Sequence, residues 1–186
     1  MYNKKMDVAC ICYTQFKNCL LERFKTKKII NLNMSNKKTL IIFQSIHHGN
    51  TIKVAKVIAN ELDAEIKKTS EVNVNDIGKY DLIGFGSGIY NGKHHISLFK
   101  LIKNIEPQKN KKVFIFSTAT ICYKKMHEPL RQELVTKGFN IIDEFICRGF
   151  TDYSFIKYFF GSLNKKRPNE KDLIKAKDFA MKIKGN

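Results

Sequence analysis

Small and polar residues separate an apolar run that ends at Phe43 from a helical pattern that begins at Asn50. This group comprises Ser45, His47, His48, Gly49, Asn50 and Thr51. The first N–H groups of a helix lack intrahelical partners and the dipole is positive there, so an anion is stabilised. Two hydroxyls, an amide and these N–H groups can accept a phosphate dianion without a lysine. The group predicts a phosphate-binding loop, whereas an ordinary turn capped by Asn50 leaves the other polar residues unexplained.

From residue 38 onward, apolar patterns typical of strands and helices alternate. The expected strands cover residues 38–44, 64–70, 80–87, 111–119 and 140–149. The expected helices cover residues 50–62, 95–105, 128–138 and 168–184. Typical end signals support the last two helices: Pro129 in the first turn and Gly138 as a stop for one, and Asn169 as a cap for the other. Such alternation implies parallel pairing through right-handed crossovers, so we predict an α/β fold: a three-layer α/β/α sandwich with a five-stranded parallel sheet.

Ligands of such sheets bind beyond the carboxyl ends of the strands, at the topological switch point. The candidate site is therefore made of residues 45–51, 87–95 and 118–127. Two common phosphate motifs are excluded. The stretch "GIYNGKH" has three residues between its glycines instead of the four of a P-loop, and "GFGSGI" lies in and after the third strand and lacks the third glycine of the dinucleotide fingerprint.

The loop after the first strand resembles that of the flavodoxin family, which reads roughly Ser/Thr-x-Thr-Gly-Asn-Thr and wraps the phosphate of FMN. The matching residues are Ser45, Gly49, Asn50 and Thr51. The loop here is one residue longer, and His47 and His48 replace its central residues. Segments 80–95 and 116–120 match the two further flavin loops, so the resemblance covers residues 38–184. It implies FMN as the cofactor and the flavodoxin-like strand order 2-1-3-4-5.

The resemblance also implies roles around the flavin ring. Main-chain groups of Ser87, Gly88 and Ile89 would contact the ring edge, and Tyr90 would stack on the ring. Asn91 and Gly92 can adopt positive φ, so their peptide is a candidate for rearrangement when the flavin is reduced; Ser87–Gly88 is an equally near candidate. The third flavin loop contributes Thr118, Ala119 and Thr120. Because the chain has no Trp, Tyr123 is expected to replace the Trp that covers the other ring face in many flavodoxins.

This reading predicts electron transfer between redox partners, with the chemistry carried by FMN. One alternative is an FMN-dependent oxidoreductase that reduces a quinone or a similar small acceptor, as in the similar menaquinone-dependent protoporphyrinogen dehydrogenase. A further alternative is a basic binding module without redox activity. The sequence shows no recognisable nicotinamide-binding segment, which favours the electron carrier.

The net charge of +17 favours anionic ligands and a redox partner with an acidic face. The lysines are scattered, and no arginine stripe with interleaved aromatic residues is present, so nucleic acid is not expected as a partner. No apolar run reaches the roughly 20 residues of a membrane span. Five cysteines in a chain of this length indicate reduced thiols and a cytoplasmic protein.

A metal site is not expected. The five histidines follow the first, third and fourth strands as adjacent pairs or singly, without a carboxylate cluster: His47, His48, His94, His95 and His127. Neighbouring histidines rarely chelate one ion well. Cys10, Cys12 and Cys19 lack a fourth ligand nearby. We interpret these histidines as solvated or phosphate-facing.

Two segments do not fit the alternating pattern. Residues 1–33 have a poor hydrophobic period, so we expect a weakly ordered extension or an over-called start, followed by a flavodoxin-like FMN-binding domain over residues 34–186. Segment 148–168 is too aromatic for a plain linker, and its apolar residues would form one side of a short helix: Phe155, Ile156, Phe159 and Phe160. This helix would either pack on the sheet as a flap or let residues 153–167 contact a partner or a membrane surface.

Overall fold

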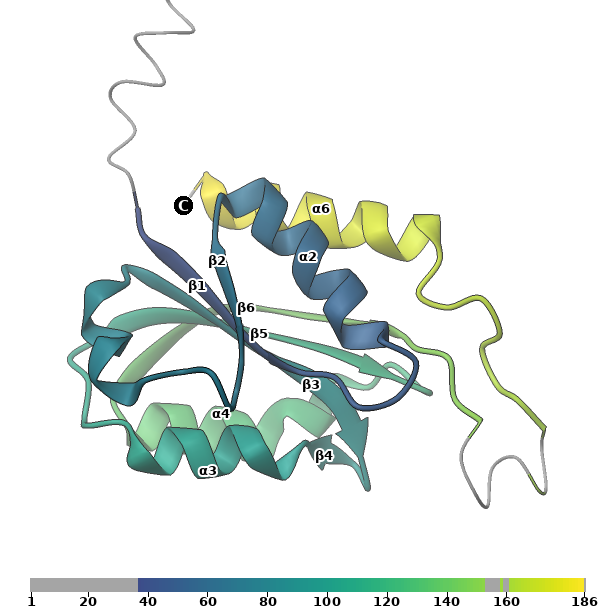
Figure 1. The fold of residues 1–186 in the computed structure, drawn as a ribbon, viewed down its shortest axis with the longest axis horizontal. Helices are drawn as coiled ribbons and strands as arrows, with labels where there is room; N and C mark the ends of the chain where they lie inside the picture. The colour runs from purple at the N-terminus through teal and green to yellow at the C-terminus, as the bar shows by residue number, and fades with distance from the viewer. Residues whose placement is uncertain (1–36, 153–157, 159–160, 186) are drawn as a thin grey trace, which may run out of the picture. The chain divides into compact units, whose positions relative to one another are not determined.

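The computed structural model describes residues 37–152, 158 and 161–185. Their core is a parallel sheet in the order β2-β1-β3-β5-β6 (Figure 1). Its strands are β1 (Thr39–Gln44), β2 (Glu65–Lys68), β3 (Leu82–Tyr90), β5 (Lys111–Ala119) and β6 (Phe139–Arg148). These are the five predicted strands in the predicted order, so the fold class is confirmed. The sequence did not predict β4 (Lys93–His94), a two-residue strand that pairs antiparallel with the end of β3.

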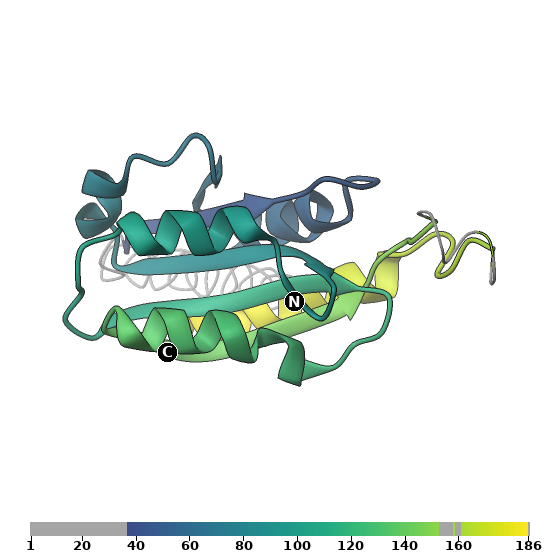
Figure 2. The ribbon, with the colours of Figure 1, turned by 90° about the horizontal axis from the view of Figure 1, so that it is seen from below.

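Helices cover both faces of the sheet, as predicted. In the described part of the chain, the α-helices are α2 (Asn50–Leu62), α3 (Ile96–Asn104), α4 (Glu128–Thr136) and α6 (Glu170–Lys184). Figures 1 and 2 show α2 and α6 on one face and α3 and α4 on the other. Two 3-10 helices, η1 (Val74–Lys79) and η2 (Lys124–His127), precede β3 and α4. The sequence did not predict them.

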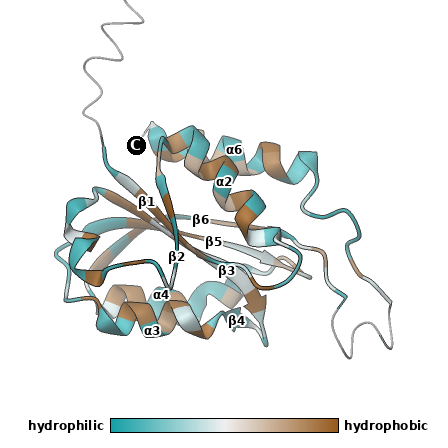
Figure 3. Ribbon diagram, viewed as in Figure 1, coloured by the Kyte–Doolittle hydropathy of each residue, from teal (hydrophilic) through white to brown (hydrophobic). Residues whose placement is uncertain are grey.

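Alternating strand residues explain why the sheet is covered on both faces. In β1, Ile41 and Phe43 belong to the core beside α2 and α6, whereas Leu40 and Ile42 belong to the core beside α3 and α4. All four side chains are at most 4% exposed. A strand that is apolar at every position loses this burial if either face is open to water. Figure 3 accordingly shows hydrophobic colour along β1 and on much of α3.

The glycines of β3 have a packing role. A Cβ atom at Gly84 would lie 2.3 Å from the ring of Phe114, and one at Gly86 would lie 2.1 Å from the ring of Phe116. Both phenylalanines are fully buried in the neighbouring strand β5. The two glycines therefore make room for aromatic rings on the α2/α6 face, which explains the repeated glycines without a dinucleotide site.

Local signals at the helix ends agree with the structure. The side chain of Asn169 accepts from the N–H of Asp172, whose carboxylate accepts from the N–H of Asn169, which is a capping box. Pro129 lies in the first turn of α4, and Gly138 beyond its end has a φ of 79°. The predicted roles of Pro129, Gly138 and Asn169 are thus confirmed, although α6 begins at Glu170 rather than at residue 168 and α4 ends at Thr136 rather than at residue 138.

Two predictions fall on residues outside the described part of the chain. These are the proposed extension over residues 1–33 and the short helix with Phe155, Ile156, Phe159 and Phe160. Among residues 37–152, 158 and 161–185, no helix combines the length and the apolar character needed to cross a membrane.

Candidate functional site

A pocket lies at the carboxyl ends of the parallel strands. Its lining residues are His47, Asn50, Thr51, Gly88, Ile89, Tyr90, Thr118, Ala119, Thr120, Gly149, Phe150 and Thr151. The structure thus brings together three predicted segments that are far apart in the sequence. Six predicted site residues do not line the pocket. His48, Gly49, Ser87 and Asn91 are next to lining residues in the chain, whereas Ser45 and Gly92 lie two residues from His47 and Tyr90.

The first segment delivers the start of α2 to the pocket. Gly49 is the N-cap with φ 64° and ψ 22°, and Asn50 is the first helical residue. The alternative in which Asn50 caps an ordinary turn is therefore wrong. The left-handed conformation suits a glycine, and no acidic side chain occupies the first turn of α2. The positive end of this helix dipole is left for an anion.

Two polar atoms of this loop are buried without a hydrogen-bond partner. They are Oγ of Ser45 and Oδ1 of Asn50. A buried polar atom without a partner costs about 1–3 kcal/mol, so such atoms usually mark a place where something else binds. The serine hydroxyl can donate to a phosphate oxygen, as can N–H groups of the helix start. The loop therefore fits a phosphate group.

Hydrogen bonds fasten this loop to the neighbouring strand ends. The Nδ2 atom of Asn50 donates to the carbonyl of Phe150 over 2.8 Å. The hydroxyls of Thr51 and Thr118 lie 3.0 Å apart and are buried. The start of α2 is thereby held against the ends of both β5 and β6.

The two adjacent histidines of the loop lie in different surroundings. His47 lies beside Tyr90, with ring centroids 6.0 Å apart. The ring of His48 lies 4.3 Å from that of Phe150, and its Nε2 atom lies 2.5 Å from the carboxylate of Asp152. His48 thus connects the loop to the segment after β6 rather than sharing a ligand with His47.

Tyr90 ends β3 and folds back over the strand. A Cβ atom at Gly88 would lie 2.7 Å from the tyrosine hydroxyl, so the glycine makes room for this side chain. Asn91 and Gly92 follow with φ values of 50° and 78°, which confirms the predicted positive-φ turn. Both are exposed at the tip between β3 and β4.

The third segment continues from the end of β5. Thr118 and Ala119 are buried, and the hydroxyl of Thr120 lies 2.8 Å from that of Thr151. Tyr123, expected to cover the flavin, does not line the pocket and is 58% exposed. Ile121 is 69% exposed beside it. The loop after Thr120 therefore presents apolar side chains to solvent at the rim of the site.

Sequence reasoning missed the contribution of Gly149, Phe150 and Thr151. A Cβ atom at Gly149 would lie 2.9 Å from Nδ2 of Asn50, so this position is closely packed against the first loop. The available signal was the end of the fifth predicted strand, since parallel strands finish at the same edge of a sheet. The sequence prediction includes only the segments after the first, third and fourth strands.

Ser87 does not present its side chain to the pocket. The side chain is fully buried, and its hydroxyl lies 2.9 Å from Nδ1 of His94 on the α3/α4 side of the sheet. Burial lowers the pKa of His94 well below its usual value, and the neighbouring His127 adds to this effect. Burial likewise lowers the pKa of His127, against the opposing effect of Glu144. Both imidazoles are therefore neutral at pH 7.

Within the described ranges, no group of three or more His, Cys, Asp and Glu side chains is arranged to hold a metal ion. The histidines that the sequence placed near one edge of the sheet divide between the pocket loop and the opposite face of the sheet.

Comparison with known proteins identifies the family. The flavodoxin domain family matches residues 40–175. An uncharacterized protein of Methanocaldococcus jannaschii is 52% identical over 151 residues, which covers 80% of this chain and 99% of that protein.

Solved structures show the same fold. A flavodoxin from the domain Archaea has a TM-score of 0.60 at 15% identity, covering 80% of this chain and 96% of its own. Flavodoxin 2 from Bacillus cereus has a TM-score of 0.59 at 21% identity, covering 77% and 95%. These similarities confirm the predicted flavodoxin-like fold. The family match confirms the predicted family, and with it FMN as the cofactor. The chain belongs to the flavodoxin domain family.

Proposed function

We propose that this protein binds one FMN in the pocket at the carboxyl edge of the sheet and carries electrons between redox proteins. The observation that carries the proposal is the buried hydroxyl of Ser45, which has no partner beside the start of α2. A phosphate supplies the missing acceptor. The bound flavin supplies the redox chemistry, and the protein supplies position, electrostatics and protection from water.

The residues around the pocket have distinct roles in this proposal. Ser45 and the first N–H groups of α2 hold the phosphate, as an anion at a helix start requires. Main-chain groups of Gly88 and Ile89 would contact the ring edge, and Thr118 and Ala119, which also line the pocket, would contact the flavin from the end of β5.

Ring binding requires a side chain to move. The pocket encloses only about 30 Å³. Tyr90 lies over Gly88, where a Cβ atom would meet its hydroxyl at 2.7 Å. We assign the movement to Tyr90, because its turn contains two residues of positive φ and its ring can then stack on the flavin.

Basic side chains around the same edge favour an acidic partner. The exposed ones are Lys93, Lys124, Lys125, Arg148, Lys165 and Lys166. Charges of one sign near an electron-transfer site steer a partner of opposite sign and accelerate encounter at low ionic strength. We propose that the redox partner docks at this edge through an acidic face.

A second candidate is an oxidoreductase that passes electrons to a quinone. The exposed side chains of Ile121 and Tyr123 at the rim of the pocket favour it, because they offer an apolar contact for a small ring. Steady-state turnover of a soluble quinone with an enzymatic reductant separates the two functions. Sustained turnover supports the oxidoreductase, whereas a single slow reoxidation event per bound flavin supports the carrier.

The FMN site is tested by titrating the flavin-free protein into FMN and recording flavin fluorescence. We expect quenching that saturates at one FMN per chain. Riboflavin, which lacks the phosphate, is the matched ligand and is expected to bind more weakly. Unquenched FMN fluorescence at saturating protein would refute the site.

A further inference from the structure

A layer of buried polar side chains lies on the α3/α4 face, directly behind the pocket edge. Ser87 and Ser117 are paired neighbours on β3 and β5, and each is fully buried. Each serine contacts one histidine, His94 or His127, and these are 2% and 0% exposed. The two imidazole rings lie 4.9 Å apart between centroids. The sequence prediction includes Ser87, His94 and His127 in the candidate site segments, with the two histidines interpreted as solvated or phosphate-facing. Their burial and their serine partners show that this interpretation is wrong for both histidines.

The hydrogen bonds around His94 leave one ring nitrogen without a partner. The hydroxyl of Ser87 donates to the carbonyl of Gly88 over 2.7 Å and accepts from the N–H of His95 over 3.0 Å. Because the only hydroxyl proton is used in this way, Nδ1 of His94 must donate to the serine oxygen over 2.9 Å. Its Nε2 atom then carries a lone pair, and this atom is buried without a partner.

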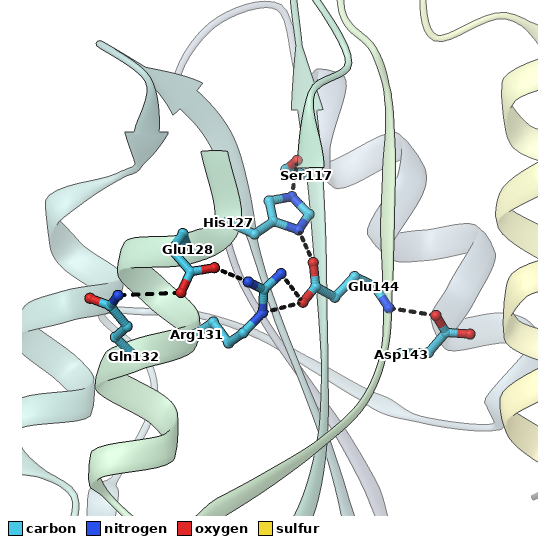
Figure 4. Close-up of polar contacts among 7 residues, drawn as sticks. All are labelled: Ser117, His127, Glu128, Arg131, Gln132, Asp143 and Glu144. Atoms are coloured by element: carbon cyan, nitrogen blue, oxygen red, sulfur yellow. Dashed lines mark hydrogen bonds and ion pairs between the residues drawn. The ribbon is translucent and has the colours of Figure 1, made fainter. Parts of the chain in front are cut away.

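His127 has a partner at each ring nitrogen. Its Nδ1 atom donates to Glu144 over 3.0 Å, and its Nε2 atom accepts from the hydroxyl of Ser117 over 2.7 Å. Figure 4 shows Glu144 between His127 and Arg131, whose Nη2 atom lies 2.6 Å from the carboxylate. An ionised carboxylate at Nδ1 is the arrangement that stabilises a protonated imidazole.

The charges that face this pair come from four elements. Glu144 of β6 favours a proton on His127, whereas Arg131 of α4 and Lys124 of η2 oppose it. Near His94, the backbone N–H of His95 at the start of α3 donates to the hydroxyl of Ser87. Near His127, Glu128 of α4 forms an ion pair with Arg131. With both imidazoles neutral, the pair holds one vacant nitrogen and one carboxylate poised beside it. It is therefore able to accept one proton when a new negative charge appears nearby.

Such a charge would appear in the adjacent pocket. Gly88 and Thr118, which immediately follow the two serines in β3 and β5, both line that pocket. We propose that the His94–His127 pair takes up one proton when FMN bound in the pocket is reduced. This inference rests on the proposed FMN site.

Oxidation of an external two-electron reductant, such as dithionite, would supply two electrons to bound FMN together with one proton from a buffer acid, and would leave one negative charge in the pocket. A second buffer acid would release a proton, which forms an N–H bond on the histidine pair, and its conjugate base would stay in solution. No bond of the protein is broken. The imidazolium charge then balances the ring charge, with Glu144 supporting it and the Ser117 hydroxyl turning to accept when the proton is on Nε2 of His127.

The first test is the pH dependence of the FMN midpoint potential between pH 5.5 and 8. For a two-electron couple, each proton that is taken up on reduction changes the midpoint potential by about 30 mV per pH unit. Uptake of one proton therefore gives a slope of about 30 mV per pH unit, and uptake of two protons gives about 59 mV per pH unit. We expect a segment near the larger slope in the unaltered protein. We expect the smaller slope in His127→Gln and in His94→Asn. His95→Asn is the matched control and should keep the larger slope.

The second test needs no variant. In ¹⁵N-histidine NMR spectra of the FMN-bound protein at pH 7, a buried imidazole should change from a neutral tautomer to imidazolium when dithionite is added. The flavin-free protein should show no such change. The inference would be overturned if the imidazoles stayed neutral after reduction, or if the potential had the same pH slope in all four proteins. In either case, quenching of FMN fluorescence would still support the FMN site. Absence of quenching would overturn both.

Discussion

Ser45→Ala is expected to stabilise the flavin-free protein and to weaken FMN binding. The Oγ atom of Ser45 is buried and has no hydrogen-bond partner. Folding therefore removes this hydroxyl from water without compensation in the free protein. Alanine removes the polar atom and keeps the Cβ atom. The two effects have opposite signs only if the hydroxyl is kept for a ligand, which makes this substitution a sharp test of the phosphate site.

The magnitudes follow from the loss of one partner. An unsatisfied buried hydroxyl costs about 1–3 kcal/mol, so even the lower value raises Tm by about 2–4 °C in a domain of this size. In the FMN-bound protein, a hydrogen bond to a charged group contributes about 1.5–3 kcal/mol. Since about 1.4 kcal/mol is a tenfold change in an equilibrium constant, Kd for FMN should rise roughly 10- to 100-fold.

The assay combines thermal unfolding of the flavin-free protein with FMN fluorescence titration. Ser97→Ala is the matched control, because the Ser97 hydroxyl has a partner in Nδ1 of His95 and lies outside the pocket. This control should lower Tm slightly and leave Kd unchanged. A Ser45→Ala protein with lower Tm and unchanged Kd would refute the phosphate assignment.

Three further results are expected. Gly86→Ala should lower the free energy of unfolding by about 1–3 kcal/mol in denaturant titrations, because its Cβ atom would meet the Phe116 ring at 2.1 Å. Stability should fall as pH drops below about 6.5, where the unfolded chain binds protons that buried His94 and His127 do not. The fall is at most about 1.4 kcal/mol per pH unit for each histidine, and His94→Asn should remove part of it in titrations at pH 5.5 and 7.5. Oxidation of the reduced protein by ferricyanide, an anion, should slow with added salt in stopped-flow traces, whereas oxidation by a neutral quinone should not.

The elements of this fold could be predicted because their signals are local. Helix α2 spans Asn50–Leu62, as its apolar spacing indicated, and Asn169 caps α6 through a side chain three residues from its partner. The parallel sheet followed from the alternation itself, since a strand, a helix and a strand in succession close in only one hand. Strand β4 has only two residues, so it offered no periodicity to detect.

The site was predicted only in part because its remaining contacts join distant positions. Asn50 reaches the carbonyl of Phe150, which is 100 residues away. Nothing near Phe150 in the sequence marks it as a neighbour of the first loop. Likewise, Ser117 and His127 become partners only after η2 turns the chain back toward β5.

The alternation of side chains along a strand separates the proposed FMN contacts from the buried histidine pair. Successive side chains point to opposite faces, so in β5 Thr118 faces the helix α2 side and contacts Thr51, whereas Ser117 faces the α3/α4 side and contacts His127. A shift of β5 by one residue in register would exchange these two environments, and Ser117, the partner of the His127 imidazole, would then face the pocket side. The fully apolar strand interiors fix that register through burial on both faces. The same burial that stabilises the sheet therefore keeps the ligand donors and the titratable pair one residue apart and on opposite sides.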